Sequence, residues 1–389
     1  MLYVPYERMS INWSHQISPA GLRLTVTLPW LSIDIDIKED DEDWIRDATT
    51  CLHTDPSNPN VQKFIKELKD YPVFYIQPRS LSDFKDRDLQ EAPDLAVDTT
   101  TPTRLIETFG CPIGTSIRGD VIPAWTWDWE KILNKARIQG TDLYDPLSFV
   151  TYLICYRLEQ ESTGWVGQDE FGAFMGNLLE KDEQRFFQAI GWVTKQAWYI
   201  TSAFCSAMEP ALVHFSKAKD LIEYYIADEV GHHKFMEQVF KDLDLKKEDF
   251  PIEGGSKWLL AAHKHVAVLS PLAFTAMINI FEVVYNEGQE PTARVLRLSS
   301  RPHAARGYDL HHKINIEHRH CDMPFNFASY LAPQPRNHAL LTLGLFEITL
   351  NLFDRMEQQL VKELEISDND HNFSQREVEA SKIAAFSSL

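Results

Sequence analysis

The stretch LIEYYIADEVGHHKFMEQVF, residues 221–240, places acidic and imidazole side chains where a helix normally buries apolar ones. Glu229 and His232 stand three residues apart, so one turn of an α-helix can present a carboxylate oxygen and an imidazole nitrogen to the same metal ion. The helical period gathers these two side chains on one broad face with four others, namely Ile222, Ile226, His233 and Met236. The stretch therefore predicts a helix that carries part of a metal site.

A second pair with the same spacing, Glu317 and His320, lies in the segment INIEHRHCD further along the chain. Between the two pairs, Glu282 stands in the apolar run AMINIFEVVYNEG. Burying an unpaired carboxylate costs several kcal/mol, and a metal ion is one way to remove that cost. We therefore predict that the metal ligands are Glu229, His232, Glu282, Glu317 and His320.

One ligand of the expected set is missing from the pattern. A pair of iron or manganese ions bridged by carboxylates takes about four carboxylates and two imidazoles from four helices. The predicted helix over residues 182–207 should supply the sixth ligand, but its apolar face carries no carboxylate. The sixth ligand therefore stays open among Gln196, Tyr199, Glu170, Glu183 and Glu347.

Each element of this pattern also has a simpler interpretation. A single Glu-x-x-His occurs by chance in many surface helices. Lys313 and Glu317, four residues apart, could form an ordinary helix ion pair. The neighbouring histidines can each be partly exposed side chains without chemistry, namely His233, His311, His312 and His318. The metal interpretation is favoured because two pairs and Glu282 occur together in the helical part of the chain.

Composition limits the classes of partner. The 389 residues carry a formal net charge of −19 and no basic stripe, which argues against nucleic acid or an anionic membrane as the main partner. The five cysteines are scattered and form no Cys-x-x-Cys pair, as expected for reduced thiols in a cytoplasmic protein. The sequence shows neither a secretory signal at its beginning nor an uninterrupted apolar run that could span a membrane.

The hydrophobic period changes along the chain. Apolar residues alternate with polar ones over residues 22–28 and 31–37, which predicts two strands joined as a bent strand or a tight hairpin. Short helices are expected over 43–51 and 61–69, and a further strand over 71–76. Residues 77–116 are rich in Pro, Asp, Ser and Thr and predict a long connection.

Long helical segments follow from about residue 144. They are predicted over residues 145–160, 168–179, 182–207, 211–242, 256–287, 306–321 and 336–365, with breaks at prolines such as Pro210, Pro251 and Pro302. The fold class is therefore mainly α: a smaller mixed α/β N-terminal domain (residues 1–140), a helical metal-binding domain (141–366) and a peripheral tail (367–389).

The helical part resembles the haem-oxygenase-like diiron oxidases and oxygenases over about residues 180–365. The resemblance lies in the order of four segments, QAIGWVTKQAWYITSAF, LIEYYIADEVGHHKF, FEVVYNEG and YDLHHKINIEHRHCD. It implies a haem-oxygenase-like helical bundle in which Glu229 and His232 are ligands from the second core helix and Glu282 is a single glutamate ligand. Glu317 and His320 look like the closing acid and histidine. Where the family usually has a further histidine, this chain has Lys313, with His312 adjacent.

The resemblance further implies a function. The chain would be an O2-dependent oxidase or oxygenase with two iron ions, or manganese in their place, and with O2 as co-substrate. Its substrate would be a small amine, amino-acid-derived or fatty-acid-derived molecule of specialised metabolism. An external electron donor and a homodimeric assembly stay open as partners. Tyr285 and Lys313 are the candidate catalytic residues beside the ligands.

Three alternatives remain at this stage. A ferritin-like N-oxygenase uses a similar ligand set on a different helical topology. A metal-free helical enzyme would rely on His233 and Tyr225 for acid–base work. A non-catalytic protein would bind a peptide or carrier partner through the N-terminal strands. Metal content separates the first of these from the other two.

Overall fold

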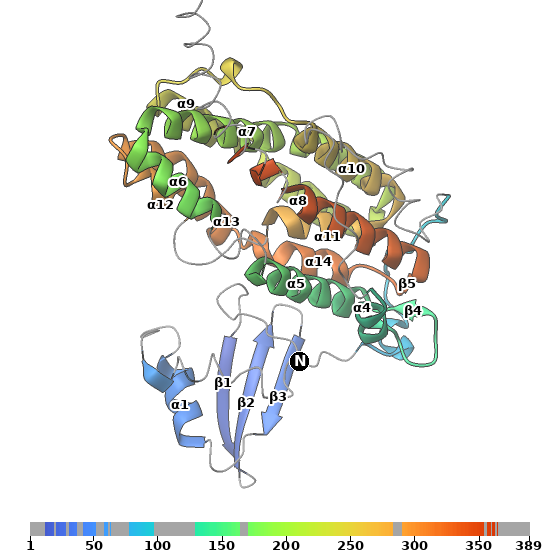
Figure 1. Cartoon of the computed structure of the whole chain (residues 1–389). Coiled ribbons are helices and arrows are strands. Elements are labelled where there is room, and N and C mark those ends of the chain that lie inside the picture. The colour runs from blue at the N-terminus through green and yellow to red at the C-terminus, as the bar shows by residue number, and fades with distance from the viewer. Residues whose placement is uncertain are drawn as a thin grey trace, which may run out of the picture.

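The architecture is mainly helical, as the sequence predicts (Figure 1). The computed structural model describes residues 12–18, 21–28, 31–36, 42–51, 58–60, 63, 78–96, 129–163, 170–282, 290–353, 356–358, 360–361 and 364. Among the helices in these ranges, none combines the length and apolar character that crossing a membrane requires. The domain boundaries at residues 140 and 366 stay predictions.

An antiparallel sheet forms near the N-terminus. Its strands are β1 (Asn12–Ser18), β2 (Gly21–Leu28) and β3 (Leu31–Asp36), in the order β1-β2-β3. Leu28 pairs with Leu31, so β2 and β3 form a tight hairpin rather than one bent strand. The short helix α1 (Glu42–Cys51) follows, as predicted. The predicted helix over 61–69 is described only at residue 63, and the predicted strand over 71–76 lies outside the described residues.

The predicted long connection is described over residues 78–96, where only the short 3-10 helix η5 (Leu81–Phe84) is regular. This segment is tied to the helical part at several points. The Nε atom of Arg79 donates to Oδ1 of the buried Asp145 at 2.8 Å. The backbone of Gln90 pairs with residues 330–332, and the carbonyl oxygen of Pro93 accepts from Nε2 of His338 at 2.8 Å. The segment is therefore irregular but anchored.

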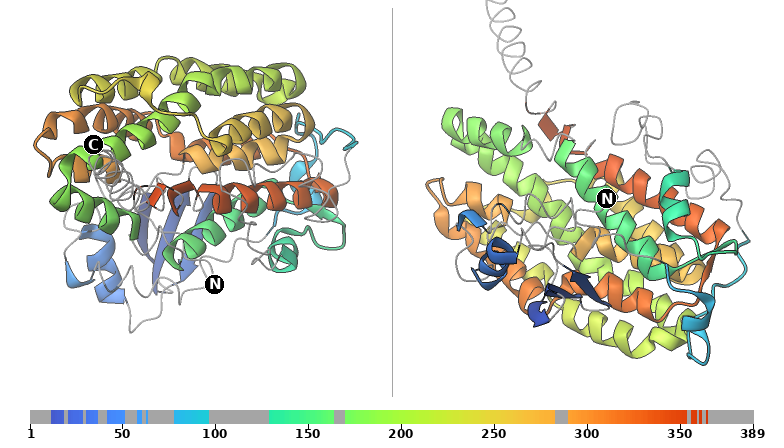
Figure 2. Two further views of the ribbon diagram at one scale, coloured as in Figure 1. Left: turned by 45° about the horizontal axis from the view of Figure 1, so that its top comes forward. Right: turned by 90° about the horizontal axis from the view of Figure 1, so that it is seen from below.

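The helical part is built around α7, which packs against α6, α8, α9 and α10. Figure 2 shows the helices lying side by side. The helices and strands of the helical part are α4 (Trp129–Ala136), β4 (Leu143–Tyr144), α5 (Pro146–Thr163), α6 (Glu170–Lys181), α7 (Glu183–His214), α8 (Lys219–Glu229), α9 (His233–Asp242), α10 (Gly254–Leu269), α11 (Pro271–Glu282), α12 (Pro291–Leu296), α13 (Arg306–Glu317), α14 (Met323–Ser329), β5 (Gln334–Pro335) and a helix over residues 336–353. The short 3-10 helices are η6 (Ser216–Ala218), η7 (Lys247–Asp249), η8 (Pro302–Ala305) and η9 (His320–Asp322).

Two hydrophobic cores share α7. Phe186 and Ile190 near its beginning pack with residues of α9, whereas Phe204 and Met208 near its end pack with residues of α8, α10 and α11. Because α8 belongs to one core and α9 to the other, the short link between these helices lies at the junction of the two cores. The one polar side chain of this link, His232, is buried there, whereas its neighbour Val230 is exposed.

Several helix ends differ from the prediction. α7 continues through Pro210, because Met208 and Ala211 are buried beside it and packing compensates for the missing backbone hydrogen bond. The predicted helix over 211–242 is broken between α8 and α9, where Gly231 has a φ of 98°. The predicted helix over 256–287 divides before Pro271, which occupies the first position of α11.

Gly307 allows α13 to approach α9 closely. A Cβ atom at this position would overlap the backbone carbonyl oxygen of Phe235 and lie 2.6 Å from Cγ2 of Val239. Since a carbonyl group inside a helix cannot rotate away, we expect Gly307→Ala to destabilise the fold by about 1–3 kcal/mol. Urea unfolding measures this change in the free energy of unfolding.

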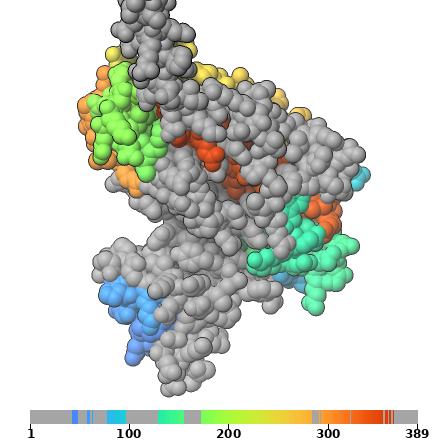
Figure 3. Space-filling view, viewed as in Figure 1, coloured from blue at the N-terminus to red at the C-terminus, as the bar shows by residue number. Residues whose placement is uncertain are grey.

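The matched control for this variant is Gly176→Ala in α6, a segment that forms part of the surface in Figure 3. A Cβ atom there would meet nothing within 4 Å. Alanine has the higher helix propensity, so we expect this control to be neutral or stabilising by up to about 1 kcal/mol. Equal stability of the two variants would contradict the close packing of α13 on α9.

Candidate metal centre

The end of α8 carries the first two donors. Glu229 is the last residue of α8, and His232 precedes α9 after the turn at Val230 and Gly231. The Nδ1 atom of His232 lies 3.0 Å from Oε2 of Glu229. The two residues thus come together as predicted, but across a helix break rather than on one continuous turn. The left-handed conformation of Gly231 interrupts the helix between the two residues.

Glu282 and His320 complete a buried group with this pair. Nδ1 of His320 lies 2.8 Å from Oε2 of Glu282, the last residue of α11, and 3.2 Å from Oε1 of Glu229. All four side chains are buried, with exposed fractions between 0 and 4 % for Glu229, His232, Glu282 and His320. These donors come from three segments that lie far apart in the sequence.

A left-handed residue places His320. α13 ends at Glu317, and Arg319 has a φ of 56°, so the chain leaves the helical path before η9. His320 therefore does not follow the helical period of α13, and its imidazole is fully buried.

The separations in this group fit a metal ion. Two donors bound at right angles, each about 2.1 Å from one ion, lie about 3 Å apart. The N···O distances of 2.8, 3.0 and 3.2 Å match this value. Among the described residues, Oε1 of Glu229 and Nδ1 of His232 have no hydrogen-bond partner, although both are buried. Glu229, Glu282 and His320 can therefore hold a metal ion, and His232 contacts this group through Glu229.

Tyr225 braces the buried group from α8. Its hydroxyl donates a hydrogen bond to Oε1 of Glu282, and its ring meets the ring of His320 edge-on at 5.6 Å between centroids. Burial raises the pKa of Tyr225 well above its ordinary value, and the charge of Glu282 adds to the effect. Tyr225 therefore remains a hydrogen-bond donor to the carboxylate at neutral pH.

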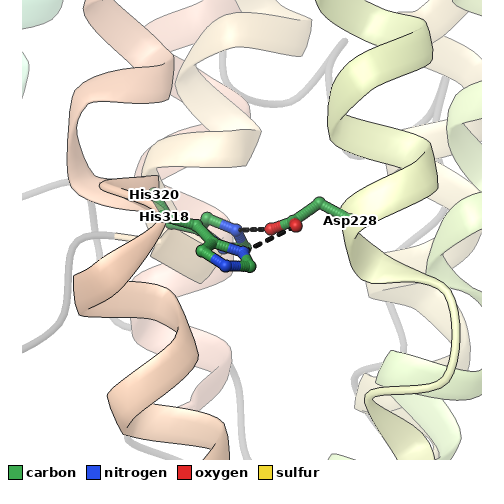
Figure 4. Close-up of side chains that lie close together, drawn as sticks. All are labelled: Asp228, His318 and His320. Carbon is green, nitrogen blue, oxygen red and sulfur yellow. Dashed lines mark hydrogen bonds and ion pairs between the residues drawn. The ribbon is translucent and has the colours of Figure 1, made fainter.

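A second group of donors lies toward the surface (Figure 4). Oδ1 of Asp228 accepts from Nδ1 of His318 at 2.6 Å, and Oδ2 of Asp228 contacts Nε2 of His320. The side chain of His318 is 43 % exposed. Asp228, His318 and His320 lie close enough to hold a metal ion as well, so His320 belongs to both groups.

Three carboxylates, those of Asp228, Glu229 and Glu282, lie next to the imidazole of His320 and affect its pKa. Burial alone would lower the pKa of this imidazole, but the hydrogen bond to Glu282 and the charges of Glu282 and Glu229 outweigh burial and raise the pKa to about 9. Burial, together with the charge of Glu282, raises the pKa of Glu229. In the metal-free protein a protonated imidazole thus partly balances buried negative charge, and a bound cation would replace that proton.

Two further side chains approach the group from α13 and α7. The ring of His311 lies 5.2 Å from the ring of His232, and burial, followed by the charge of His232, lowers the pKa of His311 to about 4. The thiol of Cys205 donates to the carbonyl oxygen of Ile226 at 3.6 Å. Burial raises the pKa of this thiol, and the charge of Glu229 adds to the effect. Both groups are therefore neutral at pH 7.

Glu317 and Lys313 do not join the buried group, and here the structure corrects the sequence prediction. Their side chains are 56 % and 64 % exposed, and Nζ of Lys313 lies 3.6 Å from Oε1 of Glu317. This is the simple helix ion pair that the spacing also allowed. The reason is that α13 buries another face, which carries Tyr308, His312 and Asn315, and leaves Lys313 and Glu317 toward the solvent. Tyr285 lies outside the described residues.

The candidates for a sixth ligand have other roles where their side chains are described. Gln196 accepts from the backbone nitrogen of Glu253 and from Ser256, both at 3.0 Å, and so ties α7 to α10. Glu183 accepts from Ser300, and Glu347 accepts from Nε1 of Trp129 at 2.9 Å. Tyr199 packs against the larger hydrophobic core. For Glu170, the structure describes only its place at the start of α6.

Asp228 and His318 were missed by sequence reasoning. Asp228 lies one residue before Glu229, so a helical period places it about 100° away from the predicted ligand face. His318 follows a helix end that the spacing did not reveal. Both reach His320 only because α13 ends where it does.

A further buried histidine lies beyond Phe204 in the larger core. The side chain of His263 is fully buried between Phe204, Phe274 and Phe281, with ring centroids at 4.9, 5.1 and 5.6 Å. Among the described residues, neither ring nitrogen has a hydrogen-bond partner. Burial lowers the pKa of His263 to about 3, so this imidazole is neutral in the folded protein.

Comparison of the chain with models of known protein families and with curated protein sequences finds no match. The functional argument therefore rests on the residues and on the geometry described above.

Proposed function

We propose that this chain is an O2-dependent, non-haem iron oxidase or oxygenase with a haem-oxygenase-like fold, acting on a small amine, amino-acid-derived or fatty-acid-derived substrate. The observation that carries the proposal is the convergence of Glu229, Glu282 and His320, which are buried and have N···O separations of 2.8 and 3.2 Å. The sequence resemblance supports the choice of iron and O2 among the metals and co-substrates that such donors accept. It also supports two ions per chain.

Each residue of the group has a role that follows from its chemistry. Glu229 and Glu282 would reduce the net charge of the bound iron, and His232 and His320 would supply nitrogen donors. Tyr225 holds Glu282 through its hydroxyl. When bound, iron in such a ligand set supplies the electrons that activate O2. Burial of the donors excludes bulk water, which protects an oxidation from side reactions.

The metal-free alternative retains one observation in its favour. Tyr225, Glu282 and His320 form a hydrogen-bonded chain in the interior, an arrangement that can also move protons without a metal. The metal-free alternative also relies on His233, and His233 is not among the donors that are close together there. Metal content and the reaction with O2 distinguish this alternative from the proposal.

The test is anaerobic loading of the metal-stripped full chain with Fe(II), followed by addition of O2. We expect two ions per chain, an absorbance change after mixing and consumption of O2. The Glu317→Gln variant is the matched control, because it removes an exposed carboxylate from the second Glu-x-x-His pair and should retain both metal and reaction. Loss of metal in Glu317→Gln would contradict the ligand assignment. Absence of iron binding in the unmodified chain would contradict the proposal.

A further inference from the structure

We propose that Asp228 is a positioning residue, which accepts the Nε2 proton of His320 and thereby directs Nδ1 of the same imidazole toward the buried donors. In this arrangement Asp228 and His318 are hydrogen-bonding partners and do not form a second metal site. The inference rests on the proposed metal centre at Glu229, Glu282 and His320 and explains how its fully buried imidazole is oriented.

The contacts of Asp228 have the geometry of charge-assisted hydrogen bonds, which bring nitrogen and oxygen to about 2.7–2.9 Å or closer. Oδ1 of Asp228 lies 2.6 Å from Nδ1 of His318, and Oδ2 of Asp228 contacts Nε2 of His320. Two ligands of one ion lie about 3 Å apart, so a metal ion between Asp228 and the two imidazoles would have to push these partners apart.

The two nitrogens of His320 face different surroundings. Nδ1 faces Glu282 and Glu229, and Nε2 faces Asp228. If Nε2–H donates to a carboxylate, Nδ1 keeps the lone pair that a metal requires. If His320 bound one metal ion through each of its two ring nitrogens, the ring would have to lose both of its protons. A neutral imidazole gives up its remaining proton only at very high pH. One metal-bound nitrogen and one hydrogen-bonded nitrogen is therefore the favoured state.

His318 holds Asp228 in the orientation that this role needs. Figure 4 shows both imidazoles meeting the same carboxylate from one side, one at each oxygen. The left-handed Arg319 between the two histidines allows this, because it takes the chain out of the helical path of α13 before His320. Since His318 is partly exposed, water can replace its hydrogen bond if the ring is removed. Because the ring of His320 is fully buried, water cannot take the place of Asp228 as the acceptor for Nε2–H without rearrangement.

The experiment is titration of the metal-stripped full chain with Co(II), using the unmodified protein and three variants. We expect Asp228→Ala to raise the dissociation constant by about 10- to 100-fold, the range typical for removing a partner of a metal-bound histidine. Asp228→Asn should recover part of this loss, because its amide oxygen still accepts from Nε2–H. His318→Ala should have a smaller effect than Asp228→Ala. The number of ions per chain should be unchanged in all three.

A spectroscopic measurement separates a positioning role from a merely structural one. In Co(II)-loaded protein, the ring proton on Nε2 of a bound histidine gives a strongly shifted NMR signal that exchanges with solvent. We expect this signal in the unmodified protein and faster exchange of the proton in Asp228→Ala, while the visible spectrum of the bound Co(II) stays the same. If Asp228→Ala fails to fold, the Asp228→Asn variant carries the comparison.

The outcomes are distinct. Loss of one ion per chain in both Asp228→Ala and His318→Ala would show that these residues are ligands of a second ion and would overturn the inference. An unchanged dissociation constant in Asp228→Ala would overturn it as well, while leaving the metal centre intact. Failure of the unmodified chain to bind Co(II) and Fe(II) would overturn the proposed function and this inference together.

Discussion

Glu229→Gln is expected to raise the dissociation constant for Fe(II) by more than about 100-fold and, at the same time, to make the metal-free protein more stable. The first effect follows because Glu229 faces both His232 and His320, at 3.0 and 3.2 Å. Removing a ligand should cost more affinity than the 10- to 100-fold typical of a partner behind a ligand. Glutamine has nearly the same size, so the change is one of charge.

The second effect follows from the pKa of Glu229. Burial and the charge of Glu282 raise this pKa, so the folded state disfavours the ionised carboxylate. When the pKa of a carboxyl group is higher in the folded state than in the unfolded state, the free energy of unfolding falls as the pH rises from the unfolded-state pKa through the folded-state pKa. At neutral pH the metal-free protein therefore carries this penalty, and glutamine, which does not ionise, removes it.

Two measurements check this pair of effects. Calorimetric titration with Fe(II) under anaerobic conditions gives the affinity, and urea unfolding at pH 7 in the presence of a chelator gives the stability of the metal-free protein. The Glu317→Gln variant should change neither quantity, since this carboxylate is exposed. A Glu229→Gln variant that binds Fe(II) normally, or that is less stable than the unmodified protein without metal, would contradict our account.

His263→Leu is expected to reduce the sensitivity of the fold to acid. The pKa of His263 is lowered to about 3 in the folded protein, whereas an unfolded histidine titrates near 6.5. As pH falls below about 6.5, the unfolded state binds a proton that the folded state does not, so His263 destabilises the fold by about 1.4 kcal/mol per pH unit. The accumulated loss is about 2 kcal/mol at pH 5 and about 4 kcal/mol at pH 3, where the folded-state imidazole is itself half protonated. Leucine cannot be protonated and removes this contribution.

The comparison is the difference in unfolding free energy between pH 7 and pH 5, measured by urea unfolding for His263→Leu and for the unmodified protein. We expect the loss on acidification to be smaller by about 2 kcal/mol in the variant. The other histidines with lowered pKa, including His311, are present in both proteins, so their contributions cancel. At pH 7 the variant should be at least as stable, because it replaces two buried nitrogens without partners among the described residues. An equal loss in both proteins would contradict the burial of a neutral His263.

The candidate site shows which inferences local spacing supports. The pairing of Glu229 with His232 and the burial of Glu282 were predicted, because an acidic or imidazole side chain on an apolar face needs a partner inside the protein. The sixth ligand, which the helix over residues 182–207 was expected to supply, could not be found from spacing. Among the described residues, α7 brings no carboxylate to the buried group. The same spacing brings Glu229 and His232 together but leaves the side chain of Glu317 exposed and away from the buried His320. Both pairs have identical local patterns, so local pattern alone could not tell them apart.

By itself, the sequence determined the mainly helical fold, the strands over residues 22–28 and 31–37 and the identity of four side chains that come together, Glu229, His232, Glu282 and His320. These follow from hydrophobic period and from the cost of burying charge, which act over short stretches of chain. Only the tertiary structure decided that Asp228 and His318 meet His320 while Glu317 faces outward. The physical reason is that α8 and α13 end just before the left-handed residues Gly231 and Arg319. Where a helix ends depends on the packing of its neighbours as much as on its own residues.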